Sequence, residues 1–500
     1  MEDTSRKAET MDILGYNGST ADELTNDRYP KKGAILVDGV VLNGPLLDAK
    51  AGEKFVEEAF PIIMEDAIKK ATDVNEKVCE WQPPEELMKL LDLELRDTGE
   101  PHHQLLQHCR DVIKYSVKTG HPRFYNQLYA GMDHYSLVAR FITEALNPSI
   151  YTYEVAPVFV LMEEVVLKKM RELIGWTEGD GIFSPGGSVS NMYAVNLARY
   201  KRCPDLKETG LSGSPPLAMF TSEESHYSVK KAAAFLGIGT RNVYMVKADK
   251  RGKMIPEELE KDIQKAKKEG ALPFIVVATA GTTVLGAFDP LSEIADICEA
   301  HGIWFHVDAS WGGGALISRK HRSLLNGIHR ADSVAWNPHK MLMAGIQCCA
   351  FLLKDNTILL FNFTAIDSFR QFCKWKYVDD YKEISLSKAV FDSNCRYLAD
   401  EIKKRKEFRL LMEPEYTNVC FWYIPLSLRN VPEDQDFWKK LHLVAPVIKE
   451  RMMKKGSMMV GYQPHRDKVN FFRQIIISPL VSREDMDFIL NEIDNLGKDL

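Results

Sequence analysis

The sequence predicts an α/β protein whose large domain has a mostly parallel β-sheet covered by helices on both faces. After Gly175, short runs of β-branched and aromatic residues alternate with helical stretches. This alternation stops at about Asp355, where the composition becomes mixed. With 500 residues, 45% of them hydrophobic, the chain is long enough for two or three domains. We therefore expect a helical N-terminal segment before the large domain and a small α+β domain after it.

The N-terminal region divides into two parts. Residues 1–50 are polar and carry little periodicity, so we expect a mostly disordered extension. From Phe55, apolar residues recur at helical spacing, with Pro61 marking a kink or a join, and Pro84 starts another helix. Residues 51–125 should form a helical segment too small to close its own core. It would pack on a larger body or on a second subunit, and dimerisation is a hypothesis.

Residues 126–365 should form the α/β domain. An apolar helical stripe from Phe159 to Leu173 leads into it. The expected strands are Leu217–Thr221, Val243–Val246, Phe274–Thr279, Ile303–Val307, Ser333–Trp336 and Cys348–Leu353. The expected helices are Val189–Tyr200, Val229–Leu236, Pro256–Lys268 and Leu291–Ala300. Sites in such sheets lie at the carboxyl ends of the strands, so chemistry is expected there.

Residues 366–500 should form the C-terminal α+β domain. Ser385–Lys404 is expected to be a helix leading into it. The expected strands are Val419–Ile424, Ser457–Gly461 and Asn470–Ser478.

Composition and charge exclude several classes of function. The net charge is -6 and the basic residues are scattered, so no nucleic-acid partner is expected. The chain shows no long uninterrupted apolar run and no apolar leader, which predicts no membrane segment and a cytoplasmic location. Nine cysteines at irregular spacing predict buried thiols, and the histidines lack metal-ligand spacing, so no metal site is expected.

Lys340 ends the stretch Trp336-Asn337-Pro338-His339-Lys340, which follows an apolar strand and precedes another apolar run. Pro338 cannot continue a strand and restricts the residue before it, so the turn is stiff. Burial disfavours the ammonium form, and a desolvated lysine amine can condense with an aldehyde to form a Schiff base. Lys340 is the candidate catalytic nucleophile. The structural alternative is a lysine that extends to the rim of the sheet.

Three further candidates precede Lys340 in the chain. Gly187 and Ser188 open a predicted helix, where free N–H groups and the hydroxyls of Ser188 and Ser190 could bind a phosphate; otherwise they cap the helix. Asp308 ends a strand, where a buried carboxylate needs a cationic partner such as a pyridinium nitrogen; otherwise it is a helix cap. His226 follows another strand, where its ring could lie on an aromatic ring; otherwise it is a core or cap residue.

These four features together match one cofactor. Pyridoxal 5'-phosphate has a phosphate, an aromatic ring, a pyridine nitrogen and an aldehyde, one group for each feature. The combination is more specific than any of its members, so the sequence predicts a pyridoxal 5'-phosphate site.

The chain resembles the group II pyridoxal-phosphate-dependent decarboxylases, in particular their acidic amino acid branch with glutamate decarboxylase and cysteine sulfinic acid decarboxylase. The resemblance is carried by His121-Pro-Arg-Phe-Tyr-Asn-Gln-Leu, Tyr151-Thr-Tyr-Glu, Gly181-Ile-Phe-Ser-Pro-Gly-Gly-Ser, Gly281-Thr-Thr-Val-Leu-Gly-Ala-Phe-Asp-Pro, His306-Val-Asp-Ala-Ser-Trp-Gly-Gly and Asn337-Pro-His-Lys. Gln127-Leu-Tyr-Ala-Gly and Ser310 point to a glutamate-decarboxylase-like acidic amino acid decarboxylase.

The resemblance implies a fold type I, aspartate-aminotransferase-like enzyme that works as a homodimer with its site at the subunit interface. Lys340 would hold the cofactor covalently, Asp308 its ring nitrogen and His226 its ring face. The other implied positions are Gly187 and Ser188 at the phosphate, Thr282, Asn337 and His339 beside the cofactor, and Asn126, Gln127 and Arg473 at the substrate. The implied reaction is decarboxylation of small acidic amino acids: aspartate to β-alanine, cysteine sulfinate to hypotaurine, and cysteate to taurine.

The sequence departs from this family between Asp355 and Cys395. Family members carry there a mobile loop with Phe-Gln-Gln-Asp-Lys and a downstream tyrosine, and this chain has neither. The span is short by about twenty to thirty residues, and without the loop water reaches the site and the proton donor is lost. Tyr377 and Tyr381 are possible substitutes for the donor. The alternatives are therefore a catalytically impaired homologue that binds the cofactor or acts as a dimer partner, and an aminotransferase or decarboxylation-dependent oxidase.

Overall fold

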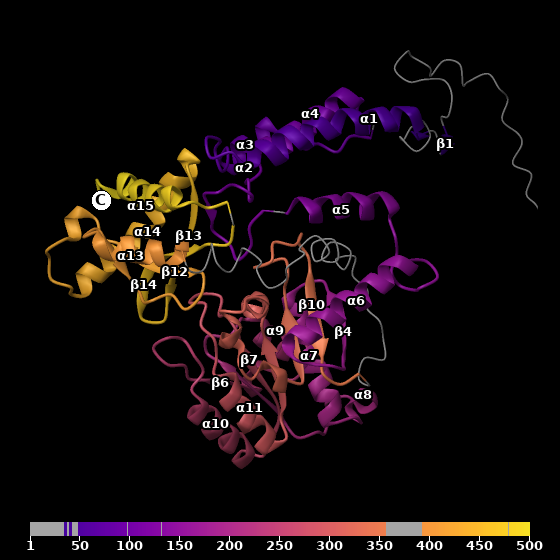
Figure 1. Cartoon of the computed structure of the whole chain (residues 1–500), viewed down its shortest axis with the longest axis vertical. Helices are drawn as coiled ribbons and strands as arrows, with labels where there is room; N and C mark the ends of the chain where they lie inside the picture. Colours follow the sequence, from indigo (N-terminus) through magenta and orange to yellow (C-terminus); the bar gives the residue numbers. More distant parts are fainter. Residues whose placement is uncertain are drawn as a thin grey trace, which may run out of the picture. The chain divides into compact units, whose positions relative to one another are not determined.

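The computed structural model describes residues 35–37, 40–42, 49–97, 99–131, 133–356, 393–478 and 480–500. The chain forms two compact units, one of Met1–Ile68 with Pro84–Lys114 and one of Lys69–Pro83 with Tyr115–Leu500 (Figure 1). Most of the predicted N-terminal extension, and the predicted substitutes Tyr377 and Tyr381, lie outside the described residues.

The smaller unit is mainly helical. Its elements are the hairpin β1 (Ile35–Val37) and β2 (Val40–Leu42) and the helices α1 (Ala49–Ile62), α3 (Pro84–Leu90) and α4 (His102–Tyr115). At the predicted join, α1 runs through Pro61 and passes into a π-helical segment, Ile63–Lys69, after which the short α2 (Lys70–Thr72) follows. Val56 and Phe60 of the predicted apolar stripe remain 62% and 45% exposed, so this unit leaves apolar surface uncovered.

The larger unit contains a seven-stranded sheet with the order β4-β10-β9-β8-β7-β5-β6. The strands are β4 (Asp180–Ser184), β5 (Leu217–Ser222), β6 (Val243–Val246), β7 (Leu272–Thr279), β8 (Trp304–Asp308), β9 (Ser333–Trp336) and β10 (Cys349–Leu353). Neighbours from β9 to β6 are parallel, and β10 is antiparallel to both β9 and β4. All six strands predicted for this domain are confirmed, whereas β4 was missed because it begins with Asp180 and Gly181, residue types that are depleted in strands.

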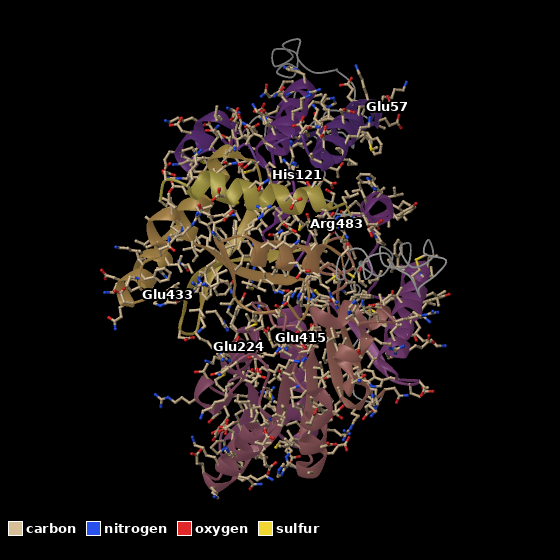
Figure 2. All side chains as sticks on the ribbon, turned by 60° about the vertical axis from the view of Figure 1, so that its left-hand side comes forward. Glu57, His121, Glu224, Glu415, Glu433 and Arg483 are labelled. Atoms are coloured by element: carbon tan, nitrogen blue, oxygen red, sulfur yellow. The ribbon has the colours of Figure 1, made fainter. Side chains whose placement is uncertain are left out.

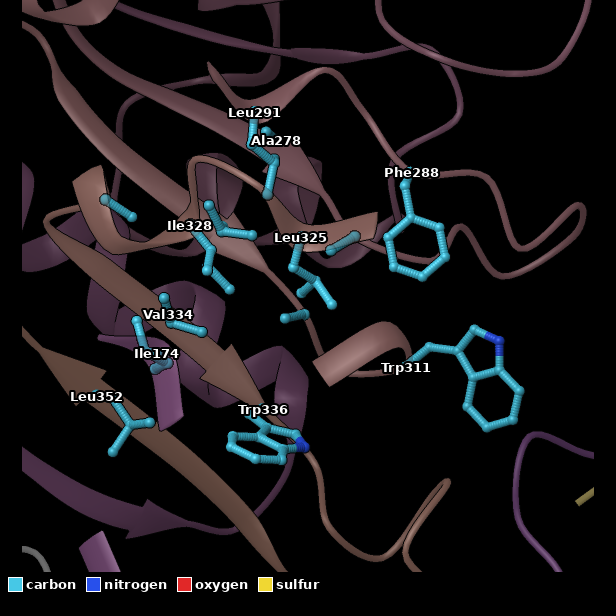
Figure 3. Close-up of a cluster of buried hydrophobic side chains, with 14 of the residues drawn as sticks. Ile174, Ala278, Phe288, Leu291, Trp311, Leu325, Ile328, Val334, Trp336 and Leu352 are labelled. Atoms are coloured by element: carbon cyan, nitrogen blue, oxygen red, sulfur yellow. The ribbon is translucent and has the colours of Figure 1, made fainter. Parts of the chain in front are cut away.

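Helices cover both faces of this sheet. They are α6 (Pro157–Ile174), α7 (Gly187–Arg202), α8 (Leu206–Thr209), α9 (Ser228–Phe235), α10 (Pro256–Lys268) and α11 (Leu291–His301), while α5 (His134–Leu146) precedes them in the chain and adds no residue to either core of the sheet. Buried residues of α6, α10 and α11 pack on one face, part of which is shown in Figure 3, and those of α7 and α9 pack on the other. Strand residues alternate between the two cores, because successive side chains of a strand point to opposite faces. The strands read as continuous apolar runs for this reason.

The C-terminal part of the larger unit is built on a five-stranded sheet with the order β11-β12-β14-β13-β3. Its strands are β3 (Phe124–Tyr125), β11 (Phe408–Leu410), β12 (Asn418–Tyr423), β13 (Met459–His465) and β14 (Lys468–Ile475), and its helices are α13 (Arg396–Lys404), α14 (Gln435–Lys455) and α15 (Arg483–Gly497). The three predicted strands are confirmed with shifted ends. The predicted helix Ser385–Lys404 is described from Ser393 onward and is helical there, with α13 beginning at Arg396. Single-turn 3-10 helices lie at Thr240–Asn242, Arg322–Leu325, Ile328–Arg330 and Leu426–Leu428, and a longer one at Gly312–Ile317.

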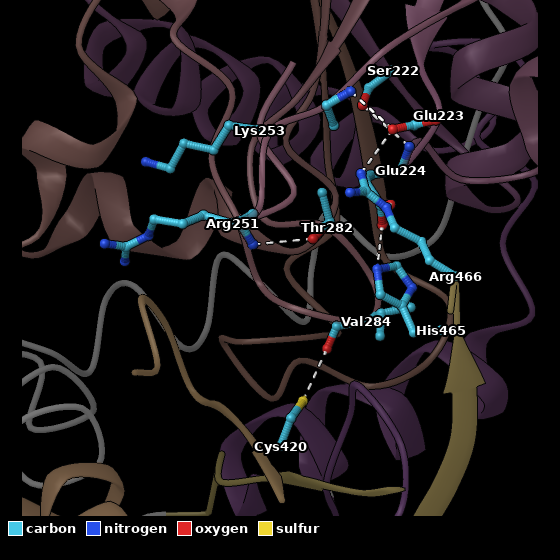
Figure 4. Close-up of polar contacts among 12 residues, drawn as sticks. Ser222, Glu223, Glu224, Arg251, Lys253, Thr282, Val284, Cys420, His465 and Arg466 are labelled. Carbon is cyan, nitrogen blue, oxygen red and sulfur yellow. Dashed lines mark hydrogen bonds and ion pairs between the residues drawn. The ribbon is translucent and has the colours of Figure 1, made fainter. Parts of the chain in front are cut away.

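Ion pairs fasten the β13–β14 hairpin to the loop after β5. Arg466, at the hairpin tip with φ +51°, places Nε 2.6 Å from Glu224 Oε1 and Nη2 2.9 Å from Glu223 Oε1. His465 Nε2 lies 3.2 Å from Glu224 Oε2 (Figure 4). Lys253 pairs with Glu415 nearby, and Glu224 and Glu415 are both labelled in Figure 2. The hairpin is thereby held against the loop that carries His226.

The carboxyl ends of the parallel strands meet at one edge of the large sheet. The register pairs Thr279 of β7 with Asp308 of β8, and Asp308 with Ala335 of β9. The segments that follow these strands therefore lie side by side, and α7 begins at the same edge because β4 runs in the direction of β9. Within the described ranges, none of the helices combines the length and apolar character needed to span a bilayer.

Candidate active site

A cavity of about 340 Å³ opens at this edge of the sheet. Seven of the predicted residues line it: Gly187, Ser188, His226, Asp308, Asn337, His339 and Lys340. These residues come from segments spread over more than 150 positions, so the fold brings together what the sequence separates. A larger hollow of about 540 Å³ lies at the opposite edge, around Trp304 and Asp332, and contains none of the predicted residues.

Lys340 faces the cavity from the turn after β9. Its backbone N–H donates to the Asn337 carbonyl oxygen over 3.0 Å, which closes the turn predicted from Pro338. The side chain keeps some exposed surface because it lines the cavity, although protein surrounds it. Burial lowers the pKa of the Lys340 amine, and the nearby Asp308 carboxylate opposes this shift. A larger neutral fraction is available as a nucleophile than for an exposed lysine.

Asp308 is buried at the end of β8 and held by three donors. Asn191 Nδ2 donates to its Oδ2 over 2.8 Å, and the Ser310 backbone N–H donates to its Oδ1 over 3.0 Å. Burial alone would raise the pKa of Asp308, but the Ser310 hydroxyl, the charge of Lys340 and the amide donors outweigh it, and the pKa lies below its usual value. The carboxylate is therefore ionised and can pair with a cationic ring nitrogen.

Asn191 connects Asp308 to two histidines. Its Oδ1 lies 3.0 Å from His306 Nε2, and its Nδ2 also donates to Ser228 Oγ over 2.9 Å. Ser228 Oγ in turn lies 2.8 Å from Nδ1 of His226. The carboxylate and the His226 ring are thus fixed through one asparagine on α7.

His226 lines the cavity beside Tyr227, with ring centroids 4.1 Å apart. Burial lowers the pKa of His226, Lys340 adds to this effect, and Asp308 opposes it. A neutral imidazole can lie against an aromatic ring without repelling a nearby cation.

Gly187 and Ser188 start α7 at the cavity wall. A side chain at Gly187 would place Cβ 2.7 Å from Asn337 Nδ2 and 2.8 Å from Ser310 Oγ, so only glycine lets these two cavity-lining side chains pack against the start of α7. Gly186, with φ +150°, precedes the first turn of α7, where free N–H groups favour an anion. The hydroxyl of Ser190, which the sequence predicted to be a second phosphate donor, instead lies 2.6 Å from Ser184 Oγ and forms a hydrogen bond with it near the start of α7.

The remaining predicted cofactor neighbours lie close to the cavity. Asn337 lines it, and its buried Oδ1 has no hydrogen-bond partner among the described residues. His339 Nδ1 lies 2.8 Å from the Cys348 carbonyl oxygen, and burial lowers the pKa of His339 to about 4. Thr282 is buried, and its Oγ1 accepts the Ala287 N–H over 3.0 Å, while its neighbours Gly281 and Thr283 line the cavity.

The predicted substrate residues lie behind this wall. Arg473 of β14 is buried; its Nη1 donates to the Thr283 carbonyl oxygen over 3.0 Å and its Nη2 to the Asn126 carbonyl oxygen over 3.5 Å. Asn126 follows β3 and is half-buried, whereas Gln127 is exposed. Tyr129, from the same segment, lines the cavity, so Arg473 and Asn126 each adjoin it through a neighbour.

This arrangement fits pyridoxal 5'-phosphate. It offers an open space beside Gly186 at a helix start, an ionised carboxylate at Asp308, an aromatic ring at His226 and an amine at Lys340. The buried Asn337 Oδ1 without a partner shows that the cavity contains a polar group suited to a bound molecule.

The pyridoxal-dependent decarboxylase conserved domain matches residues 84–386 of the chain. The chain belongs to this family. As a member it is a pyridoxal-phosphate-dependent amino acid decarboxylase of fold type I.

The chain is similar to known decarboxylases over most of its length. It is 68% identical to acidic amino acid decarboxylase GADL1 of Bos taurus, over 94% of this chain and 96% of that protein. It is 55% identical to human cysteine sulfinic acid decarboxylase, over 91% of this chain and 98% of that protein. The crystal structure of mouse CSAD superposes with a TM-score of 0.88 at 54% identity, covering 91% of this chain and all of that one. The predicted family and fold are confirmed.

The sequence missed several residues that line the cavity, among them Asn191, Tyr129 and Thr283. Asn191 lies one helical turn after Ser188, so helical spacing could have placed both on one face. Tyr129 and Thr283 each neighbour a residue that was predicted. Whether Tyr129 and Thr283 line the cavity depends on the path of a loop, which the spacing of residues in the sequence does not predict.

Proposed function

We propose that the enzyme decarboxylates small acidic amino acids, converting aspartate to β-alanine, cysteine sulfinate to hypotaurine and cysteate to taurine. The observation that supports this best is a pair of basic side chains, the buried Arg473 and the partly buried Lys449, that both contact Asn126 beside the cavity. The similarity to proteins named acidic amino acid decarboxylase and cysteine sulfinic acid decarboxylase points the same way. Such a role would place the protein in β-alanine and taurine formation.

The chain's own residues would divide the work as follows. When bound, pyridoxal 5'-phosphate supplies an electron sink for the bond that breaks. Lys340 provides the amine that attaches it, Asp308 keeps a proton on the ring nitrogen, and His226 covers one face of the ring. Gly187 and Ser188 offer backbone N–H groups, and the Ser188 hydroxyl, to the phosphate. Asn337, His339 and Thr282 shape the walls around it.

Arg473 would bind a carboxylate of the substrate. Its Nε is buried and has no partner in the described part of the chain, and burial lowers the pKa of its guanidinium. A guanidinium with a free donor suits a carboxylate or a sulfinate. Asn126 and Gln127 would contact the second acid group through their carboxamides.

Release of carbon dioxide tests the proposal. The wild-type protein loaded with pyridoxal 5'-phosphate should release it from aspartate or cysteine sulfinate, and Lys340→Ala should not. Release that does not depend on Lys340 would refute the proposal, whereas aldehyde in place of amine among the products would point to the oxidase alternative.

A catalytically impaired homologue or dimer partner is the second candidate. The comparison with the bovine relative extends over 500 residues but takes in 94% of this chain, or about 470 residues, so about 30 compared positions have no residue here. This shortfall has the size of the loop that we expect to be missing between Asp355 and Cys395. Cofactor absorbance without turnover of any acidic amino acid would favour this candidate.

The homodimer is also a proposal, as is a site at the subunit interface. Apolar side chains stand exposed at helical spacing on α5 and α6 and in the segment between them: Tyr135, Val138, Ile142, Leu146, Tyr151, Tyr153, Val155, Val158, Leu161 and Val165. A patch of this kind is typical of a surface that a partner covers. The cytoplasmic location and the domain boundaries expected from the sequence stay predictions.

A further inference from the structure

Lys449 lies on α14, in the C-terminal part of the larger unit, and its side chain is largely buried. Its Nζ donates to Asn126 Oδ1 over 3.0 Å. Across the described residues, no carboxylate lies within ion-pair distance of this ammonium. Most other lysines of α14 do have such a partner, as Lys454 does with Glu450. Burial lowers the pKa of Lys449 to about 8, which reflects the cost of a charge left without a counterion.

Arg473 approaches the same asparagine from the other side. Its Nη2 donates to the Asn126 carbonyl oxygen, and Gly461, next to both, leaves room for the contact. No carboxylate pairs with Arg473 in the described ranges. A buried guanidinium and a partly buried ammonium therefore share one neutral asparagine. Buried charges are costly unless an opposite charge accompanies them, so this pair calls for an anion from outside the chain.

The contact with Lys449 also fixes the orientation of the Asn126 carboxamide. An ammonium group only donates hydrogen bonds, so the amide oxygen must face it. The Nδ2 group is then directed elsewhere and remains available as a donor. The segment from Asn126 to Tyr129 reaches the cavity wall, and Arg473 contacts the cavity-lining Thr283.

We propose that Lys449 is a positioning residue for the acidic side chain of the substrate. It orients Asn126 as a donor toward the second acid group, and its charge adds to that of Arg473 in favouring a doubly acidic amino acid. The inference deepens the proposed function and depends on it.

Calorimetric titration of the holoenzyme with succinate and with its monoamide, succinamate, tests the inference without turnover. The two probes differ by one acid group. Lys449→Met should weaken succinate binding by about 10- to 100-fold, the effect of losing a hydrogen bond to a charged group. Succinamate binding should change far less, and Lys449→Arg should recover part of the preference for succinate. Lys454→Met, an exposed lysine on the same helix, should leave both affinities unchanged.

Equal weakening of both probes in Lys449→Met would assign Lys449 a purely structural role and overturn the inference. The inference would also be overturned if Lys449→Met kept the wild-type preference for succinate, or if the wild-type holoenzyme bound succinate no more tightly than succinamate. Carbon dioxide release from aspartate and cysteine sulfinate, measured on the same preparations, tests the proposed function separately. If the wild-type enzyme releases carbon dioxide but Lys449→Met keeps the wild-type preference for succinate over succinamate, only the inference is overturned. If Lys449→Met loses the preference for succinate but the wild-type enzyme releases no carbon dioxide, only the proposed function is overturned.

Discussion

Replacing Asp308 by asparagine should weaken cofactor binding and slow turnover. The substitution keeps the size of the side chain but removes its charge. In the wild-type protein each carboxylate oxygen accepts a hydrogen bond: Oδ2 from Asn191 Nδ2 over 2.8 Å and Oδ1 from the Ser310 N–H over 3.0 Å. An asparagine has only one oxygen, so its NH₂ group would meet one of these donors in either orientation.

The size of the effect follows from the lost interaction. A hydrogen bond between two charged groups contributes about 1.5 to 3 kcal/mol, so the dissociation constant of pyridoxal 5'-phosphate should rise about 10- to 100-fold. Turnover at saturating cofactor should fall as well, because a neutral asparagine cannot keep the ring nitrogen protonated.

Titration of the apoenzyme with cofactor, followed by visible absorbance, measures the dissociation constant directly. Asp332→Asn is a matched control, since Asp332 is another partly buried aspartate of this sheet that accepts a backbone N–H, from Phe305 over 2.7 Å, at the opposite edge. The control should bind cofactor as the wild type does. An Asp308→Asn protein with wild-type affinity and wild-type turnover would refute the assigned role of Asp308.

Three further predictions concern the phosphate site, the substrate and the dimer. Gly187→Val should abolish cofactor retention in a gel-filtration assay, with circular dichroism as the control for folding, because its Cβ would collide with Asn337 and Ser310 and displace them in the cavity wall; retained cofactor would contradict this. Arg473→Ala should raise the Michaelis constant for the acidic substrate by about 10- to 100-fold through loss of a charged hydrogen bond, and an unchanged constant would remove Arg473 from the site. Leu161→Asp, which charges the exposed face of α6, should shift the molar mass measured by light scattering from dimer to monomer, and a mass equal to that of wild type would argue against this interface.

Much of the large domain could be predicted because its strands are buried on both faces. Such strands appear in the sequence as continuous apolar runs, and the helices between them carry their own periodicity. The candidate residues Asp308, His226 and Lys340 could be brought together for a related reason. Each follows a parallel strand, and the carboxyl ends of parallel strands share one edge of the sheet.

The parts that escaped prediction lack such local signals. β4 begins with Asp180 and Gly181, residue types that are depleted in strands, so its sequence lacks a strand pattern. α14 contains Pro446, a residue that usually ends helices, and was not predicted at all. The contact between Lys449 and Asn126 joins residues 323 positions apart, and it depends on tertiary packing such as the pairing of β3 with β13.

Borohydride reduction of the holoenzyme followed by peptide mapping tests the central claim most directly. Reduction makes the bond between the cofactor and its lysine permanent, so the modified residue can be identified by mass spectrometry. A single modified peptide, with the phosphopyridoxyl group on Lys340, is the predicted result. Modification of a different lysine, or no modification of a protein that retains the cofactor, would contradict the assignment of the cavity between Asp308 and Lys340 as the active site.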